Sequence, residues 1–341
     1  MAVTIYDIAK KVNTSAVTVS LALRDSKRVS QATKQKNKGV AKQLNYQPNQ
    51  LARGLSGAST KTLAFVFNFS SLDFAHDQSY MELFHSLSQV AIEYDYKLFV
   101  HSSTVAQKVE DVFKEVVPYG VDGIVLGSNL SEEDKNVLAN PPVPTILLGR
   151  DFCSEKTSCV VYGDYEGSQK AVNHLLGLGH RRIAFVGKCD LEASIRRLNG
   201  YKDSLVSAGI DVDEKLIVEC HTDLESGESA AIALSKLPNS PTAVIAVTDL
   251  AALGVISGFR KKGLEVPNDI SVVGFDNLSM CSHTIPALTS IDLDRRKISE
   301  AVMTLCIDMI KKQSKGERKQ TSCSLVIRES TSKCNNKLLR S

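Results

Sequence analysis

The chain has 341 residues, a formal net charge of +3, 43% hydrophobic residues and 23% charged residues, which is typical of soluble globular proteins. No apolar run approaches the roughly 20 residues that a membrane-spanning helix needs, and charged residues from Asp7 onward interrupt any secretory signal. These features argue against a membrane or secreted protein and predict a cytoplasmic location. Eight scattered cysteines without a CxxC pair argue against a zinc site or a disulfide framework.

The charge is unevenly distributed along the chain. Residues 1–60 contain ten basic and two acidic residues and carry +8, so the remaining 281 residues carry −5. A basic head on a mildly acidic body is the pattern of a protein that binds a polyanion. The alternative is a basic terminus that serves only solubility.

The first residues predict two helices joined by a tight turn. Thr4 is a candidate N-cap, and Asp7 lies near the positive end of the helix dipole. Apolar residues follow at helical spacing: Ile5, Ile8, Ala9 and Val12. Asn13 tolerates the positive φ that the turn requires, and Ser15 can cap the next helix.

Residues 15–23, SAVTVSLAL, alternate like a β-strand. Their helical and basic surroundings instead favour the second helix of a helix-turn-helix. Ala9, Asn13 and Val19 then supply its small residue, its turn former and its buried aliphatic side chain. One face of this helix is expected to be exposed and carries Ser15, Ala16, Ser20 and Leu21.

A third helix is predicted after the N-cap Ser30, with Val40, Ala41 and Leu44 facing the first two helices. Asn37 occupies an expected apolar position in it, and Gly39 costs about 1 kcal/mol relative to alanine. The small head is therefore expected to be marginally stable.

A short segment follows the third helix. Pro48 stops that helix, Asn49 is a plausible cap, and Gly57 ends the segment QLARGLSG. A helix this short is unstable alone. It needs a partner, such as its twin in a dimer or a DNA groove.

These motifs together resemble the head and hinge of the LacI/GalR family of bacterial transcription regulators. The resemblance rests on TIYDIAKKVNTSAVTVSLAL, LNYQPN and LARGL in this order. It implies a helix-turn-helix head at 1–47 and a hinge at 48–60. It also implies phosphate or groove-edge contacts from Thr4, Tyr6, Ser15, Ser20, Ser30 and Thr33, with Thr18 as a further DNA-binding candidate. Arg24 and Arg28 are backbone candidates on charge alone.

Base readout is implied for Ala16, Val17 and Leu21, and none of these can form a bidentate bond to guanine. Their apolar character favours contact with thymine methyl groups. The alternative for Leu21 is packing on the head core. In the hinge, the resemblance makes Leu55 a minor-groove wedge, with Ala52 on the same face and Asn49 seating the segment.

From Lys61 onward, predicted strands alternate with predicted helices, which is typical of parallel sheets covered on both faces. One helix, residues 79–96, is predicted to carry an apolar stripe of Tyr80, Leu83, Phe84, Leu87, Ala91 and Tyr94. Two such sheets make two α/β lobes. Ligands of open α/β sheets bind beyond the carboxyl ends of the strands, so a cleft between the lobes is the expected site.

This body resembles the family's periplasmic-binding-protein-like effector domain, through phrases such as LGHRRIAFVG, VPNDISVVGFDN and LVIREST. The resemblance implies a two-lobed domain at 61–331, followed by a polar tail at 332–341. One lobe is expected to hold roughly 61–160 with 290–320, and the other 161–289 with 321–331. No heptads indicate a tetramerisation helix, so a homodimer is implied.

The resemblance places effector contacts at Arg197 and Asp276, with Thr248 at a position that is often Asn. Donors from one side chain and acceptors from the other suit the vicinal hydroxyls of a sugar or sugar derivative. The alternative is an Arg–Asp salt bridge that closes the lobe. Gly149 replaces a common acid, although Asp151 is close, which argues against the ligand of any well-known relative.

Two rival functions fit less well. A free sugar-binding protein would need a secretory signal and no head, and an enzyme would show a Walker loop, GxGxxG, GxSxG or clustered metal ligands. His174 and His180 are expected to be structural, and scattered buried thiols are usually inert. The sequence therefore predicts a dimeric DNA-binding repressor, controlled by a small molecule, without metal or cofactor. It does not say whether the ligand releases DNA or promotes binding.

Overall fold

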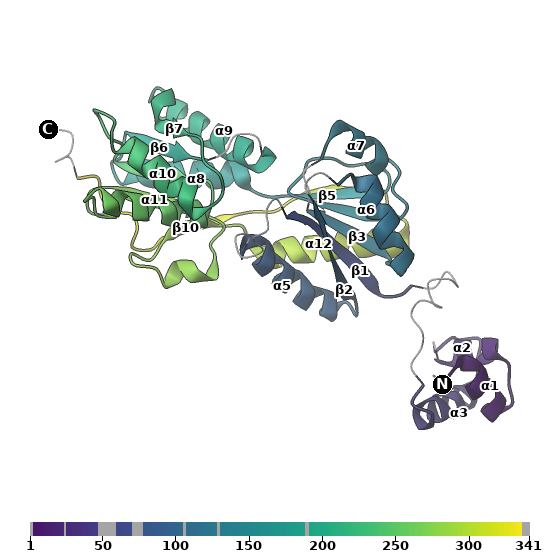
Figure 1. The fold of residues 1–341 in the computed structure, drawn as a ribbon. Helices are drawn as coiled ribbons and strands as arrows, with labels where there is room; N and C mark the ends of the chain where they lie inside the picture. Colours follow the sequence, from purple (N-terminus) through teal and green to yellow (C-terminus); the bar gives the residue numbers. More distant parts are fainter. Residues whose placement is uncertain are drawn as a thin grey trace. The chain divides into compact units, whose positions relative to one another are not determined.

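The computed structural model describes residues 3–23, 25–46, 59–69, 78–104, 107–127, 130–187 and 191–335. The chain divides into two units, residues 1–60 and 61–341 (Figure 1). Six residues singled out from the sequence lie outside the described residues: Arg24, Pro48, Asn49, Ala52, Leu55 and Gly57.

The described part of the head contains three helices, α1 (Ile5–Val12), α2 (Ala16–Leu23) and α3 (Gln31–Gln43). The SAVTVSLAL segment is therefore a helix, as the helix-turn-helix interpretation predicted. Asn13 ends α1 in the left-handed conformation, with φ 55°. The core of the head is a small cluster of Ile8, Ala9, Val12, Val19 and Ala41.

Asn37 lies inside this core, with 1% of its surface exposed. Its side-chain nitrogen donates to the Thr33 carbonyl at 2.7 Å, but its side-chain oxygen is buried and finds no hydrogen-bond partner in the described part of the chain. Burial of an unsatisfied amide oxygen costs free energy. The head therefore holds a destabilising group where an apolar residue was expected.

The first lobe of the body is built on a parallel sheet in the order β11-β5-β4-β3-β1-β2. Its strands are β1 (Thr62–Phe69), β2 (Lys97–Thr104), β3 (Gly123–Gly127), β4 (Thr145–Leu148), β5 (Thr157–Val161) and β11 (Arg318–Gln320). Its helices are α5 (Gln78–Glu93), α6 (Val109–Val116), α7 (Glu132–Leu138) and α12 (Arg295–Lys312), with a 3₁₀ turn η2 (Val117–Tyr119).

The second lobe repeats this design in the order β12-β10-β9-β8-β6-β7. Its strands are β6 (Ile183–Val186), β7 (Ile217–Val218), β8 (Ala243–Ala246), β9 (Ser271–Phe275), β10 (Thr289–Asp292) and β12 (Ser324–Val326). Its helices are α8 (Asp164–Gly177), α9 (Glu192–Ser207), α10 (Leu224–Leu234) and α11 (Asp249–Lys261), with 3₁₀ turns η3 (Glu214–Leu216) and η4 (Ser279–Ser282).

Two details of the body differ from the sequence predictions. Strand β12 runs antiparallel to β10, so the second sheet is not wholly parallel, because the chain re-enters this lobe at the sheet edge. Tyr94 follows α5 and is 39% exposed, so it does not join the buried stripe. The buried residues of α5 are Leu83, Leu87, Val90 and Ala91.

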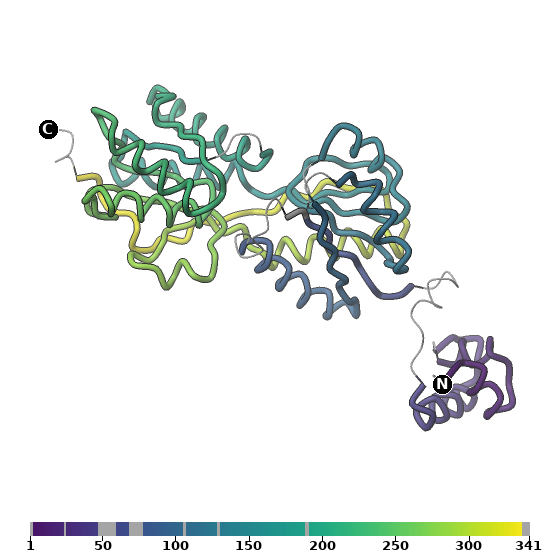
Figure 2. Tube along the Cα trace, in the orientation of Figure 1, coloured from purple at the N-terminus to yellow at the C-terminus, as the bar shows by residue number. Residues whose placement is uncertain are grey.

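The chain passes between the lobes after β5, after β10 and after β11, and these crossings run side by side at the junction (Figure 2). Helix α12 therefore packs against α5 of the first lobe although it directly follows β10 of the second. Among the described residues, no helix is both long and apolar enough to cross a membrane.

Candidate functional site

The surface of the head around α2 carries both hydroxyl and apolar side chains. Ser15 is exposed, Val17 is 68% exposed, and Tyr6 of α1 is 73% exposed. Ser20 and Leu21 are half-buried, and Ala16 packs against the head core. The three apolar candidates for base readout therefore differ, because Val17 projects furthest and Ala16 least.

Hydroxyl side chains cap the helices of the head. The Thr4 backbone and hydroxyl both donate to Asp7 Oδ2, at 2.8 and 2.7 Å, and hold the pKa of this carboxyl below its usual range. Ser15 accepts from the Thr18 amide at 3.1 Å, and Ser30 accepts from the Thr33 amide at 3.3 Å. Helix N-termini attract anions.

Asp25, the second acidic residue of the head, holds some of the basic side chains in place. Lys34 Nζ donates to the Asp25 carbonyl at 2.9 Å, and Lys38 forms an ion pair with the Asp25 carboxylate. Their positive charge, and above all the hydrogen bond from Lys38, lowers the pKa of Asp25. Arg28 is exposed. The head thus combines positioned lysines with a free arginine side chain.

In the second lobe, Arg197 of α9 is the centre of a buried charged cluster. Its Nε donates to Asp164 Oδ1 at 2.9 Å, and its Nη1 donates to the Val247 carbonyl. Its guanidinium carbon lies 3.7 Å from the centre of the Phe275 ring, and Nη2 lies 3.6 Å from Asp276 Oδ1. The structure thus brings together Arg197 and Asp276, 79 positions apart in the sequence.

Asp276 directly follows β9, at the carboxyl end of the second sheet. Its φ of 109° is a conformation that a residue with a side chain rarely adopts, and such strain is common at functional sites. Burial raises the pKa of Asp276 to about 7, while Arg197 pulls it down. Asp276 is therefore a buried acceptor whose charge is opposed by burial and favoured by Arg197.

Two neighbours of this cluster were not singled out from the sequence. Asp164, the first residue of α8, accepts from Arg196 Nη2 at 2.8 Å as well as from Arg197. Arg196 Nη2 also donates to the Gly149 carbonyl of the first lobe at 2.9 Å. The only hint of this cluster in the sequence was the pair of adjacent arginines in α9. Their partners lie more than 30 positions away in the sequence and could not be identified from it.

Tyr162 is a third residue that sequence reasoning missed. Its hydroxyl is buried and has no hydrogen-bond partner among the described residues. Burial raises the pKa of this phenol, and the charges that act on it include Asp164 and Asp276. A buried hydroxyl without a partner beside the charged cluster is a group that a bound ligand could satisfy.

The two remaining sequence candidates are occupied by contacts within the protein. Thr248 caps α11 by accepting from the Ala251 amide at 3.1 Å, and its hydroxyl lies 3.0 Å from the Thr222 carbonyl. Asp151 accepts from Arg318 Nε at 2.9 Å. Asp151 is therefore engaged away from Arg197 and does not replace the acid that is absent at Gly149.

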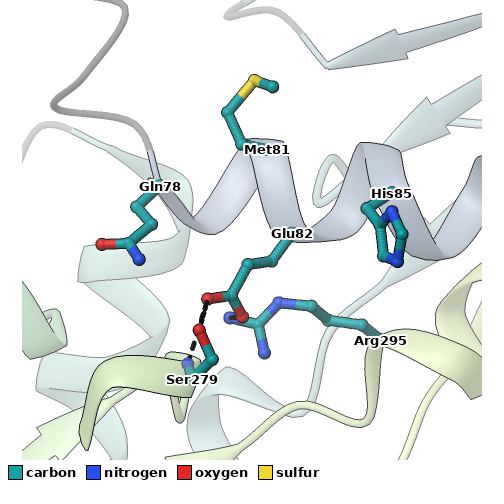
Figure 3. Close-up of a pocket in the computed structure, with 6 residues that line it drawn as sticks. All are labelled: Gln78, Met81, Glu82, His85, Ser279 and Arg295. Atoms are coloured by element: carbon teal, nitrogen blue, oxygen red, sulfur yellow. Dashed lines mark hydrogen bonds and ion pairs between the residues drawn. The ribbon is translucent and has the colours of Figure 1, made fainter.

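A pocket of about 480 Å³ lies between α5 and η4, lined by Gln78, Met81, Glu82, His85, Ser279 and Arg295 (Figure 3). Glu82 Oε1 accepts from the backbone and hydroxyl of Ser279, at 3.0 and 2.7 Å, and Arg295 lies 3.5 Å from Oε2. These contacts join the lobes. The Glu82 carboxylate of this pocket is therefore already engaged by contacts within the protein.

The two histidines predicted to be structural are held by the segment after β12. His174 Nε2 lies 3.0 Å from the Thr331 hydroxyl, and His180 contacts Thr242 and the Ser332 carbonyl at 3.0 Å each. Burial lowers the pKa of both imidazoles. Within the described ranges, no three His, Cys, Asp or Glu side chains are grouped to hold a metal ion.

Comparisons with known proteins cover both units. The model of bacterial regulatory proteins of the lacI family matches residues 4–49, and the periplasmic binding protein-like domain matches residues 172–331. The probable HTH-type transcriptional repressor ExuR of Bacillus subtilis is 32% identical, over 96% of this chain and 98% of that protein. Catabolite control protein A of Priestia megaterium is 32% identical, over 92% and 94%.

Two solved structures extend the similarity to the fold. The lac repressor dimer bound to operator and the anti-inducer ONPF has a TM-score of 0.80 at 26% identity, over 97% of this chain and 100% of that one. The complex of the transcriptional regulator CelR with cellobiose has a TM-score of 0.72 at 27% identity, over 96% and 99%.

Proposed function

The chain belongs to the LacI family of bacterial transcriptional regulators, and from this premise we propose how its two units act. It is a DNA-binding transcriptional repressor and not an enzyme, which confirms the family, fold class and function predicted from the sequence. We propose that a head at 1–47 and a hinge at 48–60 bind a pseudo-palindromic operator in the cytoplasm. A small molecule bound in the body at 61–331 then controls this binding.

The DNA-binding half of the proposal rests on the basic segment and its capped helices. Short polar groups at three helix N-termini suit phosphates, and the half-buried Leu21 and exposed Val17 suit thymine methyl groups. The phosphate contacts would come from the hydroxyl candidates, Tyr6, Arg24 and Arg28. Leu55, supported by Ala52 and Asn49, would enter the minor groove between two heads of a homodimer.

One observation supports the proposal that the body binds an effector. This observation is the buried cluster at the carboxyl ends of β8 and β9. Ligands of open α/β sheets bind at this edge. Arg197 is already fixed by Asp164 and Phe275, while the strained Asp276 and the unpartnered Tyr162 hydroxyl can bond a ligand. Acceptors and donors together favour a sugar or sugar derivative. The CelR structure contains such a ligand, cellobiose.

The DNA-binding half is tested by selecting operators from a random duplex library with the full chain. Binding of the selected duplex should weaken steeply as salt rises, because phosphate contacts release counterions. A chain that lacks residues 1–60 should lose this binding. Operator binding by the truncated chain would contradict the proposal. Leu21→Arg should shift the selected half-sites toward guanine, and unchanged sites would rule out readout by Leu21.

The effector half is tested by calorimetric titration with sugars, sugar phosphates and nucleobases. Arg197→Ala and Asp276→Asn should each weaken binding of the active compound at least 100-fold, about 2.7 kcal/mol. Operator affinity without ligand should stay unchanged. Arg260→Ala is the matched control, because Arg260 is exposed on α11 of the same lobe. Unchanged ligand affinity in both cluster variants would place the ligand elsewhere, without affecting the DNA-binding half.

A further inference from the structure

Two cysteines of the first lobe lie with their sulfur atoms in contact. Cys153 is exposed in the connection between β4 and β5, and Cys159 is buried in β5. Their Sγ atoms are 3.1 Å apart, and both are free thiols. A disulfide bond is about 2.05 Å long, so the sulfurs need to approach by only about 1 Å to form one.

Hydrogen bonds hold the backbone on both sides of this pair. The Ser154 amide donates to the Thr157 carbonyl at 2.9 Å, and the Gly316 amide donates to the Glu155 carbonyl at 3.1 Å. Cys159 donates from its amide to the Glu317 carbonyl at 3.0 Å. The two sulfurs are therefore in contact across a turn whose backbone is held by hydrogen bonds on both sides.

Burial assigns different roles to the two thiols. The ion pair of Arg318 Nε with Asp151, at 2.9 Å, lies close to both sulfurs. Burial raises the pKa of the Cys159 thiol to about 12, whereas Cys153 is exposed. The exposed Cys153 is therefore the group that meets an oxidant first.

We propose that Cys153 and Cys159 form a reversible disulfide when the protein meets hydrogen peroxide. The Cys153 thiolate attacks one peroxide oxygen, the O–O bond breaks, and the departing hydroxide takes a proton to become water. The resulting sulfenic acid is attacked by the Cys159 sulfur. The S–S bond forms as the S–O bond breaks, and the hydroxide leaves with the thiol proton as a second water. Two thiols lose two electrons, and the peroxide gains them.

This bond would tie β5 to the segment that contacts the second lobe. The segment begins at Gly149, whose carbonyl accepts from Arg196. Disulfides in intracellular proteins are usually transient and redox-sensing. The pair is thus a modification site beside the lobe junction, distinct from the Arg197 cluster, and it does not depend on the nature of the effector.

The test is peptide mapping of the full chain after treatment with hydrogen peroxide. Trypsin cuts after Arg150, Lys156 and Lys170, so the bond joins peptides 151–156 and 157–170. We expect this linked pair, a loss of two titratable thiols from eight, and full reversal by dithiothreitol. Hydrogen exchange of residues 150–156 should slow in the oxidised protein.

Cys153→Ser should abolish the linked peptides and is expected to fold, because Cys153 is exposed. Cys334→Ser is the matched control and should retain them. Three results would overturn the proposal: Cys153 oxidised to sulfinic acid while Cys159 stays a thiol, Cys153 linked to a different cysteine, or unchanged exchange in residues 150–156 of the oxidised chain.

Discussion

The head and the body of this repressor are stabilised in different ways. Five apolar side chains of three short helices form the buried core of the head, and Asn37 is buried among them with an unsatisfied oxygen. The body buries two larger clusters across two six-stranded sheets. A small domain buries a smaller fraction of its surface. The large core can therefore carry strained, desolvated groups such as Asp276, whereas the head has little stability in reserve.

One pair of helices in the body packs very closely. Helices α10 and α11 lie side by side (Figure 1) and meet through Gly227, Gly254 and Gly258. A Cβ atom at Gly254 would overlap the carbonyl of Leu224 on the neighbouring helix. Close-packed interiors cannot absorb such an overlap without moving backbone. The head offers the opposite case, because a Cβ at Gly39 meets no atom within 4 Å.

The largest effect is expected from Gly254→Ala in the body. The added methyl group should force α10 and α11 apart and lower the free energy of unfolding of the body by about 3 kcal/mol. Thermal and urea unfolding of the full chain measure this loss, and hydrogen exchange of residues 3–46 serves as the internal control. If the body of the variant were as stable as that of the wild type, α10 and α11 would be able to accommodate the methyl group, and the prediction would be wrong.

Asn37→Leu should stabilise the head by about 1–2 kcal/mol. Leucine has nearly the same shape as asparagine, so it removes the unsatisfied oxygen and adds apolar burial. Slower hydrogen exchange in α1 to α3 of the full chain would report the gain. Gln35→Leu is the matched control, since Gln35 is exposed on the same helix and should change little. Equal exchange rates in the Asn37 variant and the wild type would remove the reason to call the head core defective.

Gly39→Ala should stabilise the head by up to about 1 kcal/mol, because alanine is the better helix former. The substitution is exposed and enters open space. Exchange of the α3 amides again measures the effect. The same change at Gly177, where a Cβ also meets no atom within 4 Å, serves as the control and should leave the head unchanged. A gain in the head from the Gly177 variant would contradict the independence of the two units.

The sequence predicted the head better than the site. Thr4, Asn13, Ser15 and Ser30 were identified because capping depends on neighbours within three residues. The direction of β12 was not predicted, because a three-residue strand has no pattern that fixes its orientation.

The parts of the site that were not predicted from the sequence depend on long-range contacts. Arg197 and Asp276 came from resemblance, and the structure shows that they share a cluster. Asp164 and Tyr162 were missed because each meets this cluster only after the sheets have formed. The contact of Cys153 with Cys159 was missed for a similar reason, since a turn followed by a strand brings together thiols without a CxxC motif.

The smallest expected effect is a difference between the head and the body in how their stability depends on pH. Burial lowers the pKa of His180 below its ordinary value of 6.5, so the unfolded chain binds a proton there more readily than the folded body. The contribution of His180 to the stability of the body should therefore be lost as pH falls below about 6.5. In the head, Asp7 and Asp25 have lowered pKa values. Their contribution is present above the ordinary carboxyl pKa of 3.8 and is lost only in more acidic solution.

The His180→Gln variant isolates the contribution of His180 to the pH dependence of the unfolding free energy. Asp249 and Asp276, whose pKa values burial raises to about 6 and about 7, act in the opposite sense. Their contribution to the free energy of unfolding is lost as pH rises through those values, and it is the same in both proteins. Urea unfolding at pH 7.5 and at pH 5.0 gives the unfolding free energy of the wild type and of the variant. The amount by which the wild type exceeds the variant should therefore be smaller at pH 5.0. At each pH, hydrogen exchange in the head should be the same in both proteins. A difference that is constant between these pH values would show that His180 titrates equally in the folded and unfolded body.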